Sequence, residues 1–250
     1  MRTPRKTDAP LGDRDEARRR FLVRALTAGL FAGGAGWNLP ALASIFGRLP
    51  GKLPEGKSIF ELSGSVQVNG KPATTATVVR PGDTVRTGDG SHVIYAVGSS
   101  AYIVREKSVL EMDLGRTARS ALRLVSGKVL AVFGRRGPKD SLNFRTPTAT
   151  VGIRGTGLYA EAGADQTYLC TCYGTTQLAS AFDPGATEEV TATHHNARYI
   201  LKDPEKGKRI VLAPFINHTD LELMTLEALV GRQVPFGLPD TEYQGPRREY

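Results

Sequence analysis

Short segments in which apolar and polar residues alternate, separated by turn-forming residues, recur along most of this chain and restrict it to a β-rich fold. Examples are Leu62–Val68, His92–Val97 and Tyr168–Tyr173, each followed by Asn or Gly, residues that favour turns. No segment of ten or more residues with the 3.6-residue period of a helix occurs before residue 218. The sequence therefore predicts a mainly-β fold, either a β-sandwich of short strands or a β-solenoid-like coil.

Two segments share a strand–glycine–strand pattern, LRLVSGKVLAVF and YLCTCYGTTQLAS. In the first we expect strands over Leu122–Val125 and Val129–Phe133, joined by a turn at Ser126-Gly127. In the second we expect strands over Tyr168–Tyr173 and Thr175–Leu178 around a central glycine. Such weak self-similarity suits a sandwich or a solenoid.

One short helix is expected near the end of the chain, because Thr219 or Asp220 can cap its start and Gly231 can end it. Its apolar residues would pack on the sheet. In chain order we expect a signal peptide (1–43), a Pro/Gly-rich linker (44–57), a β domain (58–213), a short helical segment (214–231) and an extended or disordered tail (232–250).

The N-terminal residues have the order of an export signal: a positively charged start, an apolar stretch over 25–36, and small residues at Ala41 and Ala43 that predict cleavage before Ser44. Arg18, Arg19, Phe21 and Leu22 resemble the twin-arginine export signal of bacteria. The alternatives are a basic amphipathic helix or an uncleaved membrane anchor. We expect a periplasmic or otherwise exported protein, whose only membrane contact is this segment if it is not cleaved.

The net charge of +8 does not indicate a nucleic-acid partner. Residues 1–43 carry eight Arg or Lys against four Asp or Glu, which is half of the net charge. The basic residues of the remainder are scattered, without the interleaved aromatics that stack on bases. We therefore expect no nucleic-acid partner.

Several segments together resemble the FecR domain family, a periplasmic module first known from the ferric-citrate transport regulator. They are GSVQVNG (64–70), PGDTVRTGDGSHVIYAV (81–97), LRLVSGKVLAVF (122–133) and FRTPTATVGIRGTGLYAE (144–161). The last is the most specific, and its motif residues are Thr146, Pro147, Ala149, Arg154, Gly155 and Thr156.

The resemblance covers about residues 60–180 and implies a β-rich exported module that binds or signals without catalysing a reaction. Its partner would be another protein of the cell envelope. In the regulators of this family the module follows a membrane helix and a cytoplasmic segment that binds a sigma factor. This chain offers only a signal peptide there, so the resemblance carries over the fold and a binding or signalling role.

Cys170 and Cys172 are the residues most suggestive of chemistry. Positions i and i+2 of a strand face the same side, so the two sulfurs would project together. His194 and His195 follow some twenty residues later, where only one of them can share that face. Two thiolates and one or two imidazoles could hold zinc or copper. Two other interpretations remain open: the two thiols are a redox pair that can be oxidised, or they are inert buried cysteines.

No motif for catalysis stands out, and we expect a protein without enzymatic activity. The chain has neither a G-x-S-x-G nor an H-E-x-x-H motif. Residues 51–58 fit the spacing of a phosphate-binding loop, but that loop requires a preceding strand and a following helix. Here a Pro-rich linker precedes and a strand-like segment follows, so we interpret the match as coincidental.

Overall fold

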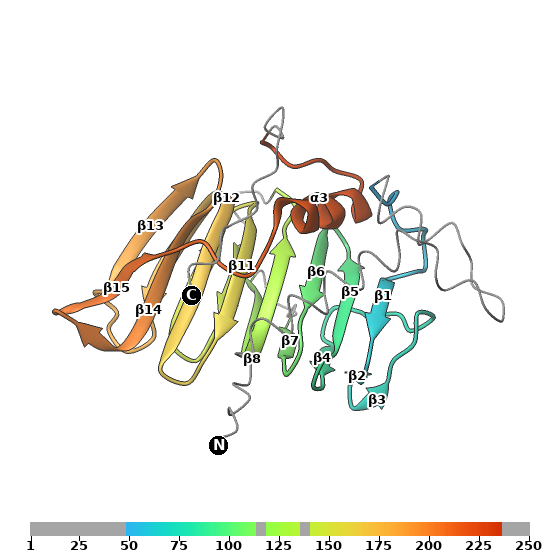
Figure 1. Ribbon diagram of the computed structural model, residues 1–250, viewed down its shortest axis with the longest axis horizontal. Helices are drawn as coiled ribbons and strands as arrows, with labels where there is room; N and C mark the ends of the chain where they lie inside the picture. Colours follow the sequence, from blue (N-terminus) through green and yellow to red (C-terminus); the bar gives the residue numbers. More distant parts are fainter. Residues whose placement is uncertain (1–48, 114–118, 136–140, 237–250) are drawn as a thin grey trace, which may run out of the picture. The chain divides into compact units, whose positions relative to one another are not determined.

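Fifteen β-strands and one short helix, α3, make up the part of the chain described by the computed structural model, residues 49–113, 119–135 and 141–236 (Figure 1). The predicted signal residues Arg18, Arg19, Phe21, Leu22, Ala41 and Ala43 lie outside these ranges. The prediction of a mainly-β fold with one short C-terminal helix is confirmed for the described residues. Among them, no helix is long and apolar enough to span a membrane.

The strands form two layers, which we call the first and second sheets. In spatial order the first sheet contains β1 (Ile59–Ser63), β5 (His92–Val97), β6 (Ser100–Val104), β8 (Arg119–Val132), β11 (Gly157–Ala162), β12 (Gln166–Ser180), β14 (Asn196–Glu205) and β15 (Lys208–Ala213). The second contains β3 (Lys71–Pro72), β2 (Val66–Val68), β4 (Thr84–Thr87), β7 (Val109–Asp113), β8, β9 (Ser141–Arg145), β10 (Ala149–Ile153), β12 and β13 (Thr187–Ala192). All of these pairs are antiparallel except β8 with β9, which is parallel.

Strands β8 and β12 belong to both sheets, because each bends at a glycine. The first half of β8 pairs with β7 and β9, and the second half pairs with β6 and β11. Gly127 lies at the bend with φ +87°, a left-handed conformation that favours glycine, and a Cβ there would lie 2.5 Å from Cα of Ser108. Gly174 has the same place in β12, with φ +84°.

This continuity corrects the expectation from the two strand–glycine–strand segments. Ser126-Gly127 is not a turn between two strands, and Tyr168–Tyr173 and Thr175–Leu178 belong to one strand. A glycine with positive φ is compatible with both a hairpin turn and a bend within a strand. Which one forms depends on whether the flanking halves pair with each other or with other strands.

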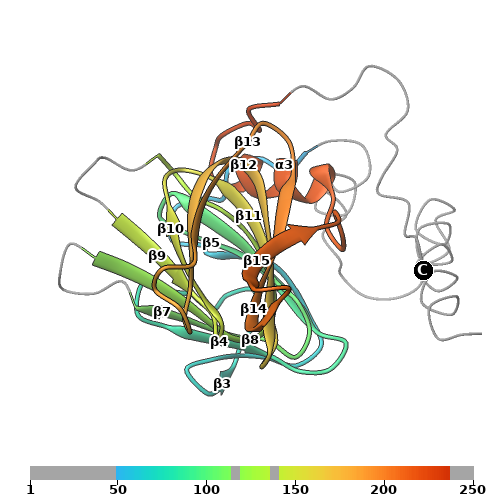
Figure 2. The same ribbon diagram turned by 90° about the vertical axis from the view of Figure 1, so that its left-hand side faces the viewer.

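The main core lies between the two sheets and consists of the inward-facing residues of both. Strand β10 shows the pattern: Ala149, Val151 and Ile153 are buried, while Thr150 and Gly152 between them are partly exposed. A second apolar cluster lies on the other side of the first sheet, between its outer face and α3. Figure 2 shows this layering, with β9 and β10 on one side and α3 on the other.

Helix α3 (Asp220–Leu229) begins with a capping box. The hydroxyl of Thr219 accepts from the backbone N–H of Glu222, whose carboxylate accepts from the backbone N–H of Thr219. Leu223, Leu226 and Leu229 are buried, and α3 lies against β6 and β8. The predicted cap at Thr219 is therefore observed.

Candidate metal centre

Cys170 and Cys172 both point to the outer face of the first sheet, as the alternation of strand residues predicts. Both side chains are fully buried and belong to the cluster between this face and α3. Leu169, between the outward-facing Tyr168 and Cys170, belongs to the main core instead. The period of two within β12 thus places two sulfur atoms side by side under the helix.

His195 reaches this cluster from the connection between β13 and β14. The pairing of β12 with β14 sets Thr171 opposite Asn196, so the residue before Asn196 lies beside Cys172. The backbone N–H of His195 donates to the carbonyl oxygen of Cys172 at 2.9 Å, and His195 adopts φ +45°. This left-handed turn directs its imidazole toward the two cysteines, with Nδ1 at 3.7 Å from Sγ of Cys170.

His218 approaches from the other side, from the segment that precedes α3. Its Nε2 lies 3.3 Å from Sγ of Cys172 and 3.2 Å from Nδ1 of His195. One donor atom from each of Cys170, Cys172, His195 and His218 lies within 4.8 Å of the others. Residues from three separate parts of the chain therefore converge on one point.

Each imidazole forms a hydrogen bond through the nitrogen that points away from the other donor atoms. These bonds determine which nitrogen directs a lone pair toward the other donor atoms. Nδ1 of His218 lies 2.7 Å from the carbonyl oxygen of Ile216, which can only accept, so Nδ1 donates. Nε2 of His195 lies 2.8 Å from Oδ1 of Asp220, a carboxylate that likewise accepts. In the neutral rings the lone pairs of His218 Nε2 and His195 Nδ1 then face each other, an arrangement that a cation between them stabilises. Such outer hydrogen bonds are typical of metal-binding histidines.

The spacing of the donor atoms fits a tetrahedral ion. With metal–sulfur bonds of about 2.3 Å and metal–nitrogen bonds of about 2.05 Å, tetrahedral angles require sulfur–nitrogen separations of about 3.5 Å and nitrogen–nitrogen separations of about 3.3 Å. The sulfur–nitrogen distances of Cys170 to His195 and of Cys172 to His218 are 3.7 and 3.3 Å, the nitrogen–nitrogen distance is 3.2 Å, and the other separations are within 4.8 Å. Two thiolates and two imidazoles in this arrangement are ligands for zinc, and soft thiolates also suit copper(I).

The electrostatics of the cluster favour one thiolate. The pKa of Cys170 is lowered to about 4, and the largest cause is its side-chain hydrogen bond with Cys172. The contacts with both imidazoles also lower this pKa, whereas burial raises it. Burial raises the pKa of Cys172, and the neighbouring Cys170 adds to that rise. Burial lowers the pKa of His195, but the hydrogen bonds with Cys170 and Asp220 outweigh it, so that this pKa is raised. The thiolate is the form of cysteine that binds metals.

Aromatic rings cover the imidazoles. Phe215 stacks on His195 with 4.0 Å between ring centroids, and Tyr159 stacks on His218 with 4.6 Å. His218 is 1% exposed and the side chain of His195 is 6% exposed. A site with four protein ligands and no open position matches structural metal sites and not catalytic ones, which keep a position for water or substrate.

The structure brings together three of the four residues proposed from the sequence and leaves out the fourth. His194 does not point into the cluster; its Nε2 lies 3.0 Å from each oxygen of Asp220, and its side chain is 48% exposed. His218 takes its place. No local pattern around His218 in the sequence marks it as a ligand, because it reaches the sulfurs only through the docking of the segment that carries it.

The six residues of the family motif form two corners at the ends of β10. Thr146, Pro147 and Ala149 lie at the β9–β10 turn, where the hydroxyls of Thr146 and Thr148 both bond to that of Thr167. Arg154, Gly155 and Thr156 lie at the connection from β10 to β11, which crosses from the second sheet to the first. The motif therefore marks positions that shape the fold.

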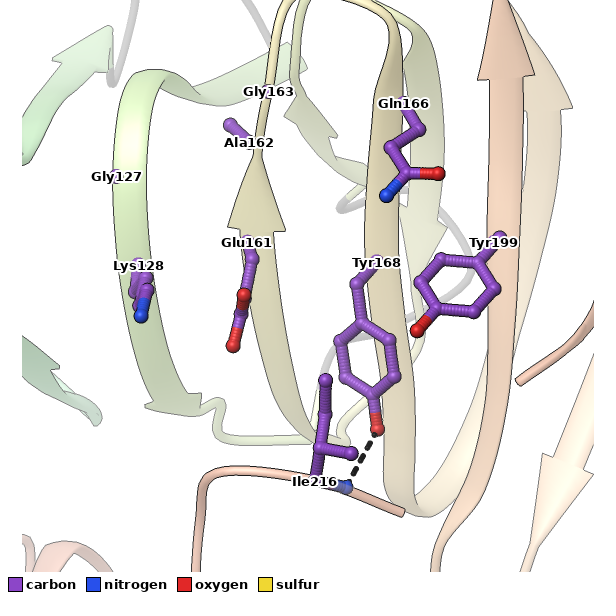
Figure 3. Close-up of a pocket in the computed structure, with 9 residues that line it drawn as sticks. All are labelled: Gly127, Lys128, Glu161, Ala162, Gly163, Gln166, Tyr168, Tyr199 and Ile216. Atoms are coloured by element: carbon purple, nitrogen blue, oxygen red, sulfur yellow. Dashed lines mark hydrogen bonds between the residues drawn. The ribbon is translucent and has the colours of Figure 1, made fainter. Parts of the chain in front are cut away.

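A groove of about 260 Å³ lies beside the cluster on the first sheet, lined in part by Tyr168, Tyr199, Lys128, Glu161 and Ile216 (Figure 3). The hydroxyl of Tyr168 accepts from the backbone N–H of Ile216 at 3.2 Å and donates to the carbonyl oxygen of Pro214 at 2.9 Å. Tyr168 thus anchors the same segment that carries His218.

Comparisons with known proteins give no family for this chain. No family model matches it, and no curated protein matches it. Two crystal structures of a protein from Parabacteroides distasonis ATCC 8503, provisionally described as an anti-sigma factor, are similar with a TM-score of 0.43 and 11% identity. Each match covers 51% of this chain and 57% of the other. The chain therefore spans little more than half of the length of the structures it matches, and a likeness of this extent supports no conclusion about function.

Proposed function

We propose that this chain is a non-enzymatic module that binds one transition-metal ion, zinc or copper(I), through Cys170, Cys172, His195 and His218. The observation that carries the proposal is the convergence of four buried donor atoms within 4.8 Å of one another, with three of their separations close to tetrahedral values. The outer hydrogen bonds to Ile216 and Asp220 support it, because they orient both imidazoles for binding. If the two thiols instead undergo redox chemistry or are inert buried cysteines, the protein should hold no stoichiometric metal.

The test is elemental analysis of the full-length protein, purified without chelators and also after loading with Zn²⁺ or Cu⁺. We expect close to one equivalent of metal in the wild-type protein, and little in the variants His218→Gln and Cys170→Ser. The matched control is His92→Gln, since His92 is a partly exposed histidine that contacts Glu61 at 3.1 Å and lies outside the cluster. Metal content far below one equivalent in the loaded wild-type protein, or equal content in His218→Gln and His92→Gln, would contradict the proposal.

A spectroscopic measurement on the wild-type protein does not depend on how well the variants fold. Cobalt(II) in a tetrahedral site with thiolate ligands has intense visible bands, which octahedral cobalt lacks. Addition of one equivalent of Co²⁺ should produce these bands, and Zn²⁺ should remove them. Weak bands of octahedral type would show that the four side chains do not bind together.

We further propose that the chain is exported and binds a protein of the cell envelope in a signalling role, as the FecR resemblance implies. The observation in its favour is that the motif residues lie at the two corners that join β9, β10 and β11, where a family signature for this fold would be expected. N-terminal sequencing of the mature protein should begin at Ser44, and lysines in place of Arg18 and Arg19 should prevent export. Protein that stays in the cytoplasm with its N-terminus intact would contradict export, and absence of any envelope protein after crosslinking in cells would contradict the binding role.

A further inference from the structure

The proposed ligands belong to two parts of the fold that are held together by non-covalent contacts. Cys170, Cys172 and His195 are presented by the strands of the first sheet and their connection. His218 belongs to the segment 214–231, which includes α3 and which we call the helical segment. We propose that the helical segment controls access to the metal: the ion enters and leaves only when this segment separates from the sheet, and the bound ion in turn holds the segment in place. This inference rests on the proposed metal site.

Burial of the donor atoms is the first reason. Cys170 and Cys172 are fully buried, and His218 is 1% exposed. Phe215, from the helical segment itself, covers the ring of His195. A chelator therefore has no access to the ion while the helical segment is docked.

The contacts of the helical segment with the sheet are the second reason. Leu223, Leu226 and Leu229 are buried in the same cluster as the outer face of the first sheet, with Ala101, Ile103, Leu130 and Val132. Outside α3, the hydroxyl of Tyr168 forms hydrogen bonds with the backbone of Pro214 and Ile216, as described above. These contacts are independent of the metal, so the helical segment can dock without it, and separation has a free-energy cost that can be altered by substitution.

An ion pair adds a further contact. Arg105 donates to the carboxylate of Glu222 at 2.9 Å and to the carbonyl oxygen of Asn217 at 3.0 Å. Asn217 precedes His218 and has φ +60°, so this contact supports the turn that presents the imidazole. Docking and metal binding therefore share residues, and linkage requires that each stabilises the other by the same factor.

The first experiment compares two leucine deletions in the zinc-loaded full-length protein. Leu226→Ala removes a fully buried side chain from the helical segment, and Leu110→Ala removes an equally buried one from β7, in the core between the sheets. The measured quantity is the rate of zinc release into excess chelator. We expect Leu226→Ala to accelerate release at least about 30-fold, the factor given by about 2 kcal/mol for a buried leucine, and Leu110→Ala to leave it nearly unchanged. The rate should not depend on chelator concentration.

The second experiment uses the wild-type protein, so it does not depend on the folding of a variant. Hydrogen exchange of the backbone amides is measured with and without one equivalent of Zn²⁺. Amides of α3 should exchange at least about tenfold more slowly with zinc, because metal-bound His218 opposes separation. Amides of β4 and β7 in the second sheet should change much less.

The outcomes separate this inference from the metal site on which it rests. If zinc binds with one equivalent but Leu226→Ala and Leu110→Ala release it at the same rate, or α3 exchanges equally with and without zinc, the controlling role of the helical segment is wrong and the metal site stands. If zinc does not bind at all, both are wrong.

Discussion

Asp220 offers the sharpest test of how the fold prepares the proposed metal centre, because it contacts a proposed ligand without being one of the four. Its Oδ1 accepts from Nε2 of His195 at 2.8 Å, which leaves Nδ1 of that ring facing the sulfurs. In Asp220→Asn the charge is lost while the shape is kept, so the imidazole becomes a weaker ligand. Loss of such an outer partner lowers metal affinity by about 10- to 100-fold, or about 1.4 to 2.7 kcal/mol.

Asp220 is also the first residue of α3, so the same substitution affects the helix. A carboxylate in the first turn stabilises a helix by about 0.3 to 1 kcal/mol. Urea denaturation of the metal-free proteins measures the effect on folding without the metal, which includes the hydrogen bonds of Asp220 with His194 and His195. Competition with a chromogenic chelator for Zn²⁺ measures the dissociation constant, and the two effects can be separated.

The matched control for Asp220→Asn is Glu222→Gln. It removes the same charge from the same turn, and glutamine preserves the capping box with Thr219. Because partly exposed ion pairs contribute at most about 1 kcal/mol, the loss of the contact with Arg105 should change the dissociation constant by less than about fivefold. Equal dissociation constants for Asp220→Asn and wild type, or for the two variants, would refute the role of Asp220 in orienting His195.

Two further predictions concern the fold. In urea denaturation, Gly127→Ala should destabilise the protein by at least about 2 kcal/mol more than Gly70→Ala. Both glycines have positive φ, but only at Gly127 would a Cβ lie against the backbone of Ser108. Equal losses of stability would contradict the close approach at the β8 bend. Tyr173→Phe should cost about 1 to 3 kcal/mol in the same assay, because it removes a hydrogen bond to the carboxylate of Glu227, which is only 3% exposed. Unchanged stability of Tyr173→Phe would show that this buried hydrogen bond is not maintained in solution.

The local pattern of the sequence determined the class of the fold and half of the proposed metal centre. Alternation with a period of two is a property of each strand, so the mainly-β fold follows from it, as does the shared face of Cys170 and Cys172. The cap at Thr219 is equally local, because Glu222 completes it three residues later. For such features the interacting groups are close in sequence, and no knowledge of the rest of the chain is needed.

Only the tertiary structure decided what depends on strand pairing and docking. Gly127 was expected in a turn, but it became a bend because the halves of β8 pair with different strands. The register of β12 with β14 decides between the two adjacent histidines: His195 points toward the two cysteines, and His194 stays at the surface. His218 lies 46 residues from Cys172 in sequence and meets it only because α3 packs its leucines on the first sheet. Contacts of this range arise from the sum of many weak pairings and from apolar burial, which no short segment encodes.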